Sequence, residues 1–188
     1  MSTTTQNRLE GKIGGITLEG YPHPTSALFV ALTRLLLGGM MLFAGLGKLT
    51  IFAGEPFDAS GYLVHGVEAV SPVSGLYAAM AANEVVLATI NVIIPTTQIL
   101  IGVALILGAF VRLAALGGAI QMLAFYLGGW EGEWLALFDS TLIYAGVFLL
   151  LGALAAGRIA GLDRRIERIE VGGQPLVERY PRLRYILG

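Results

Sequence analysis

The chain has 188 residues, of which 55% are hydrophobic and only 13% are charged, and its formal net charge is -1. A soluble domain carries about 25% charged residues, so the composition excludes an ordinary soluble protein and indicates an all-α integral membrane protein with one domain. The chain has no cysteine, which excludes thiol–disulfide chemistry, iron–sulfur ligation and cysteine-type zinc sites within it.

A polar segment over residues 1–25 precedes the first apolar stretch, with a small hairpin expected about its Gly14-Gly15 pair. Thr25 or Ser26 can cap the first apolar helix, which is predicted over residues 27–49. A mixed loop follows over residues 50–83. Within it, residues 57–70 can form a short amphipathic helix at the membrane surface.

The most hydrophobic part of the chain predicts two antiparallel helices, over residues 84–109 and 111–127, joined by a very short turn. Each is long enough to cross a bilayer, which takes about 20 mostly apolar residues. A fourth apolar helix is predicted over residues 139–156, where Asp139 can cap it. The membrane domain thus spans residues 26–156, and a basic tail over residues 157–188 holds a second hairpin about Gly172-Gly173.

The distribution of lysine and arginine predicts the orientation in the membrane. The N-terminal segment, the short turn and the tail are basic, whereas the two opposite loops hold only Lys48 among seven acidic residues. The expected architecture is therefore a four-transmembrane-helix bundle with both termini cytoplasmic and the loop over residues 50–83 external. The tail arginines are expected to meet anionic lipid rather than nucleic acid: Arg158, Arg164, Arg165, Arg168, Arg179, Arg182 and Arg184.

Two cations on the first helix are candidate ligand-binding residues. Arg34 lies roughly 12 Å into the helix, where an unpaired charge is costly. It either faces a ligand inside the bundle or extends to the cytoplasmic headgroups. Lys48 follows fourteen residues later on nearly the same face. It is either part of the same site or an interfacial anchor that pairs with Asp139 or Glu84.

Polar side chains form a stripe at seven-residue spacing on the second helix: the carboxylate of Glu84 and the amides of Asn91 and Gln98. Buried amides in a membrane need hydrogen-bond partners, so the stripe is expected to face the interior, with Gln121 of the third helix as the partner of Gln98. These residues either hold helices together or line a ligand pocket.

The external loop offers a weaker candidate, because Asp58, Tyr62 and His65 share one face if that segment is helical. They are either a substrate or proton-transfer site or a solvated face. The only other histidine, His23, is predicted on the opposite side of the membrane, so no bis-histidine haem and no metal site are expected in this chain.

Two short motifs resemble the signatures of DoxX-type membrane proteins. One is Arg34-Leu-Leu-Leu-Gly38 through Phe43, Gly45 and Lys48, and the other runs from Gly102 through Gly108 and Arg112 to Ala115. The resemblance covers about residues 27–155. The family pattern usually has a glutamate where this chain has Gln98.

The resemblance implies a DoxD-like subunit of a thiosulfate:quinone oxidoreductase in the plasma membrane of a prokaryote, working with partner subunits. Arg34, Gln98 and Gln121, with Lys48, would then line a quinone pocket. The alternative is a non-catalytic membrane scaffold, assembly factor or structural subunit, in which the same residues only pack helices.

Overall fold

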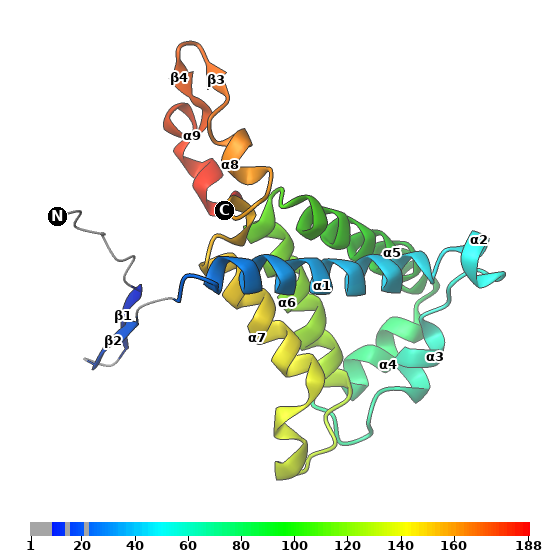
Figure 1. Ribbon diagram of the computed structural model, residues 1–188. Helices are drawn as coiled ribbons and strands as arrows, with labels where there is room; N and C mark the ends of the chain where they lie inside the picture. Colours follow the sequence, from blue (N-terminus) through cyan, green and yellow to red (C-terminus); the bar gives the residue numbers. More distant parts are fainter. Residues whose placement is uncertain (1–8, 14–15, 21–22) are drawn as a thin grey trace.

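The computed structural model describes residues 9–13, 16–20 and 23–188, and it is mostly helical (Figure 1). Three helices of the described part are long and apolar enough to cross a membrane: α1 (Ser26–Leu46), α5 (Glu84–Leu107) and α6 (Val111–Gly128). A fourth apolar helix, α7 (Ser140–Ala153), has 14 residues and is therefore only about 21 Å long.

Shorter elements fill the connections. The loop between α1 and α5 holds α2 (Thr50–Ala53), α3 (Ser60–His65) and α4 (Ser74–Ala82). The 3-10 helix η1 (Trp134–Phe138) precedes α7. The tail holds η2 (Ala156–Arg158), α8 (Asp163–Ile166), β3 (Glu170–Val171), β4 (Gln174–Pro175), α9 (Leu176–Arg179) and η3 (Pro181–Tyr185). An N-terminal hairpin consists of β1 (Leu9–Ile13) and β2 (Ile16–Gly20).

The long helices form two pairs: α1 packs along α5, and α6 packs along α7. Glycines allow the close approach within each pair. A Cβ at Gly102 would lie 2.5 Å from the backbone nitrogen of Leu42, and one at Gly118 would lie 2.6 Å from the ring of Phe148. Both distances are too short for a Cβ atom, so glycine at these two positions is what allows the helices to pack this closely.

The helices α5 and α6 diverge from their common turn (Figure 1). The turn is compact because Gly108 and Phe110 both adopt left-handed conformations, with φ of 66° and 54°. At this end of the molecule, which we call the turn end, the tail packs against α5 and α6. At the opposite end, the loop end, α3 and α4 lie between the diverging helices.

The structure confirms both predicted hairpins. Strands β1 and β2 pair antiparallel with Ile13 opposite Ile16, and β3 pairs with β4 about two glycines that have φ of 66° and 80°. The turn residues Gly14 and Gly15 lie outside the described residues.

Some helix ends differ from the predicted ones. The first helix ends at Leu46 instead of residue 49, and the expected surface helix over residues 57–70 shrinks to the six residues of α3. Thr25 occupies the N-cap position of α1 without capping it, because its hydroxyl contacts His23 Nδ1 at 2.8 Å. Asp139 does cap α7, accepting a hydrogen bond of 2.9 Å from the Leu142 backbone nitrogen.

Candidate functional site

A cavity of about 550 Å³ lies at the loop end, between α5 and α6. Its wall is almost entirely apolar, and only three of its side chains carry a polar terminal group: Lys48, Tyr62 and Tyr77. An apolar cavity with a few convergent polar groups is the usual form of a small-molecule site. We call it the loop-end cavity. Its lining residues are Lys48, Phe57, Ala59, Tyr62, Leu63, Tyr77, Met80, Ile90, Ile94, Ala124 and Phe125.

Hydrogen bonds to the end of α6 explain why α3 and α4 cover this cavity. The last carbonyls of a helix have no partner within the helix. Here Tyr77 Oη donates to the Ala124 carbonyl at 2.9 Å, Ser71 Oγ to the Leu127 carbonyl at 2.6 Å, and Tyr62 Oη to the Phe125 carbonyl at 3.3 Å. On the other side, the Ala59 backbone nitrogen donates to Asn91 Oδ1 of α5 at 2.8 Å. The loop therefore bridges the two diverging helices.

Lys48 supplies the positive charge of the loop-end cavity. Its ammonium group donates a hydrogen bond of 2.9 Å to the Ala44 carbonyl and lies 5.6 Å from the centre of the Phe57 ring. Within the described part of the chain it has no ion-pair partner, so neither Asp139 nor Glu84 neutralises it. Burial lowers the pKa of Lys48. Because an ammonium has three N–H groups, two remain for a ligand.

Tyr62 and Tyr77 line the cavity, and the hydroxyl of each is hydrogen-bonded to α6. Each hydroxyl has a single proton, and both protons are directed to carbonyls of α6. Burial raises the pKa of Tyr62 and of Tyr77, and for Tyr62 the neighbouring Tyr77 adds to this effect. Both hydroxyls therefore stay neutral and can accept hydrogen bonds.

A second apolar cavity of about 670 Å³ continues along α5 and α6. It shares Ile94, Ala124 and Phe125 with the loop-end cavity, so together they form one groove, which we call the α5–α6 groove. Gln121 lines the second cavity, and its Oε1 atom has no hydrogen-bond partner among the described residues. This oxygen is itself buried, and a buried carbonyl without a donor is costly.

Gln98 is only 3% exposed and lines neither cavity of the groove. Its Oε1 atom also has no partner within the described chain. Because a hydrogen bond between two amides needs one of the Oε1 atoms as acceptor, Gln98 and Gln121 are not the expected pair. The predicted stripe is therefore divided: Asn91 binds the loop, Gln98 is buried, and Glu84 is exposed.

Arg34 is 2% exposed and lies at the turn end instead of in the groove. Its guanidinium donates to three backbone carbonyls of the tail, those of Ala156 at 2.5 Å, Ile159 at 2.8 Å and Ala160 at 3.3 Å. The structure therefore does not bring Arg34 and Gln121 to one cavity. Arg34 neither extends to solvent nor faces a pocket, and it holds the tail against α1.

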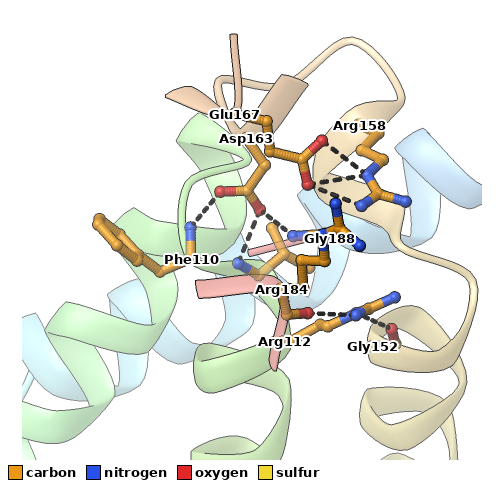
Figure 2. Close-up of polar contacts among 9 residues, drawn as sticks. Phe110, Arg112, Gly152, Arg158, Asp163, Glu167, Arg184 and Gly188 are labelled. Carbon is orange, nitrogen blue, oxygen red and sulfur yellow. Dashed lines mark hydrogen bonds and ion pairs between the residues drawn. The ribbon is translucent and has the colours of Figure 1, made fainter. Parts of the chain in front are cut away.

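The second buried charged residue at the turn end is Asp163, which the sequence did not single out. It is completely buried and lies close to Arg34. Its carboxylate accepts hydrogen bonds from the backbone nitrogens of Phe110 at 2.7 Å, Val111 at 3.0 Å and Gly188 at 3.0 Å (Figure 2). Two of these nitrogens belong to the start of α6, where a negative charge is favourable. Asp163 thus joins the α5–α6 turn to the tail.

Of the external-loop candidates, only Tyr62 lines a cavity. His65 is exposed, and Asp58 accepts hydrogen bonds from the Ser60 side chain at 2.6 Å and backbone at 2.9 Å, which lower its pKa. Asp58 therefore orders the start of α3. The part of the chain that the structure describes contains no group of three potential metal ligands.

The family model described as DoxX matches residues 29–130, which is more than half of the chain. The match includes α1, α5, α6 and the loop that carries α3 and α4, and hence every residue that lines the groove. No solved structure matches the chain.

Proposed function

The chain belongs to the DoxX family of multi-pass membrane proteins, and from that premise we propose that it is the quinone-binding membrane subunit of an oxidoreductase of DoxD type. The quinone ring would occupy the loop-end cavity, and its isoprenoid tail would follow the α5–α6 groove. The electron donor, thiosulfate or another reduced sulfur compound, would act through a partner subunit.

We further propose that α7 completes a fourth membrane crossing, with both termini in the cytoplasm of a prokaryote. The concentration of arginine in the tail supports this orientation. The length of α7, about 21 Å, is less than the thickness of a typical hydrocarbon core, which is about 30 Å. A bilayer accommodates such a short helix by becoming thinner around it. The loop-end cavity then lies near the outer surface of the membrane.

One feature supports the quinone most strongly: the apolar groove beside two long apolar helices has Lys48, Tyr62 and Tyr77 among the lining residues of its loop-end cavity. Apolar walls suit a lipophilic tail, and these three polar side chains suit a ring with two oxygen atoms. Lys48 would donate to a quinone carbonyl. The hydroxyls of Tyr62 and Tyr77 would accept from the O–H groups of the reduced form, since their own protons bind α6.

When bound, a quinone supplies an acceptor of two electrons and two protons. The residues of this chain would orient the ring and keep bulk water from it. The polar side chains of the cavity fit both redox forms of a quinone. Lys48 is an ammonium donor for a carbonyl of the oxidised form, and Tyr62 and Tyr77 are neutral hydroxyl acceptors for the O–H groups of the reduced form.

Lys48→Met is expected to weaken quinone binding about tenfold or more, because a hydrogen bond to a charged group is worth about 1.5–3 kcal/mol. The measurement is a titration of the purified protein in nanodiscs with a short-chain ubiquinone or menaquinone, followed by tryptophan quenching. Lys12→Met, the same change in β1, is the control. Equal affinity of wild type and Lys48→Met would contradict the proposal.

The pH dependence of the same titration has a defined sign. Burial lowers the pKa of Lys48, so its positive charge is lost at a lower pH than that of an ordinary lysine. Quinone affinity should therefore decrease as the pH rises through this lowered pKa, and Lys48→Met should remove that decrease.

A second candidate function is a structural subunit of a larger membrane complex. The role of Arg34 favours it, because this residue, expected at the ligand site, instead binds the backbone of the tail. In that case the protein would copurify in a stoichiometric complex without quinone, and Lys48→Met would leave the complex intact.

A further inference from the structure

We propose that a recess at the turn end binds the phosphate headgroup of an anionic phospholipid. The recess has a volume of about 350 Å³ and is formed by the end of α5 and the first part of the tail. It combines three arginines with two leucines that continue toward the membrane-spanning helix. Its lining residues are Leu107, Arg158, Ala160, Gly161, Leu162, Arg164 and Arg165. This inference does not depend on the proposed quinone site.

The charge of the recess is positive because its nearby acidic groups are already engaged. Glu167 binds Arg158 through three hydrogen bonds of 2.7 to 3.0 Å, which neutralises one arginine (Figure 2). The carboxylate of Asp163 is buried and directed to backbone nitrogens. Arg164 and Arg165 are exposed and have no ion-pair partner among the described residues. Two positive charges therefore remain for a phosphate.

The backbone of the recess is held in place before any ligand binds. The Leu162 nitrogen donates to the Leu107 carbonyl at 3.2 Å, and the Asp163 nitrogen donates to the Gly108 carbonyl at 2.8 Å. From the other side, Arg34 binds the carbonyls of Ile159 and Ala160. The arginine-bearing segment is thus fixed to the end of α5 on both sides.

The apolar side of the recess favours a lipid over a free phosphate ion. Leu107, the last residue of α5, is 50% exposed, and Leu162 is 37% exposed. A phospholipid can place its phosphate between Arg164 and Arg165 and its acyl chains along α5, so it satisfies both features. Inorganic phosphate satisfies only the first.

Other arginines of the tail region make different contacts. Arg179 donates to the Val171 carbonyl, and Arg112 donates to the carbonyls of Gly152 and Arg184. These guanidinium groups stabilise the fold of the tail. Arg164 and Arg165 of the recess therefore differ from these two arginines, because their guanidinium groups make no such contact with the described part of the tail.

The test is native mass spectrometry of the full chain in mild detergent, titrated with phosphatidylglycerol and, separately, with phosphatidylcholine. We expect selective binding of phosphatidylglycerol that decreases at high salt. The double variant Arg164→Gln/Arg165→Gln should lose roughly 25-fold in affinity, because each basic residue near a membrane surface contributes about fivefold.

The matched control is Arg168→Gln/Arg182→Gln, which removes two exposed tail charges outside the recess. It should retain nearly wild-type binding. Neither double variant removes a hydrogen bond within the described chain, and unchanged melting temperatures would verify that both fold. Equal losses in the two double variants, or full displacement of the lipid by millimolar inorganic phosphate, would overturn the proposal.

Discussion

Asp163→Ala is expected to prevent stable folding of this protein or to lower its melting temperature by on the order of 10 °C or more. The carboxylate is completely buried and accepts three backbone hydrogen bonds, from the nitrogens of Phe110, Val111 and Gly188. Its removal leaves three backbone donors without partners and removes a negative charge that acts on Arg34. A buried donor left unsatisfied costs about 1–3 kcal/mol, so the loss of all three bonds costs several kcal/mol.

The measurement is thermal unfolding of the detergent-purified protein by circular dichroism, together with the yield of monodisperse protein. Asp139→Ala is the matched control, because Asp139 also accepts a backbone hydrogen bond but only at the exposed start of α7. Loss of such a cap costs about 1 kcal/mol. Similar stabilities of the two variants would mean that Asp163 does not hold the turn end together.

Arg34→Ala is expected to destabilise the protein by a similar amount, several kcal/mol, because a hydrogen bond from a charged group is worth about 1.5–3 kcal/mol and Arg34 makes three of them. Three tail carbonyls would lose their donor, and Asp163 would lose its nearby cation. The tail would then separate from α1, which limited proteolysis detects as new cleavage within residues 156–163.

Arg34→Lys separates charge from geometry. Lysine keeps the positive charge but lacks the planar set of donors that reaches three carbonyls, so an intermediate stability is expected. The fraction of this variant that folds should bind quinone as the wild type does, because Arg34 lines neither cavity of the groove. A fully stable Arg34→Lys protein without quinone binding would instead assign Arg34 to the ligand site.

The long helices were predictable because their signal is local. Hydrophobic runs with few charges identified α1, α5 and α6 within a few residues. For Arg34 the sequence left open whether it faces a ligand or extends to the headgroups, and the structure shows it buried against the tail instead. The partners themselves were not predictable. They are backbone carbonyls more than 120 residues away in sequence, and no side-chain pattern marks them.

The groove was missed for a similar reason. Its covering segment, α3 and α4, is ordered by hydrogen bonds from Tyr62, Ser71 and Tyr77 to the end of α6, and a hydrophobic pattern along the sequence does not reveal contacts of this kind. One signal was present in the sequence. Tyr77 is a polar aromatic residue in an otherwise apolar segment beside a membrane helix, and a buried tyrosine hydroxyl usually has a hydrogen-bond partner. Gln121 was recognised as buried, but its neighbours depend on how α5 and α6 diverge.

The most direct test of the proposed quinone site is photolabelling of the membrane-embedded protein with an azido-quinone that carries an isoprenoid tail, followed by peptide mapping. The proposed site predicts adducts on residues 57–63 and 90–94 and near Phe125, which line the loop-end cavity, and their loss in the presence of excess unlabelled quinone. Displaceable adducts confined to the turn end around Arg34, or no displaceable adduct at all, would contradict it.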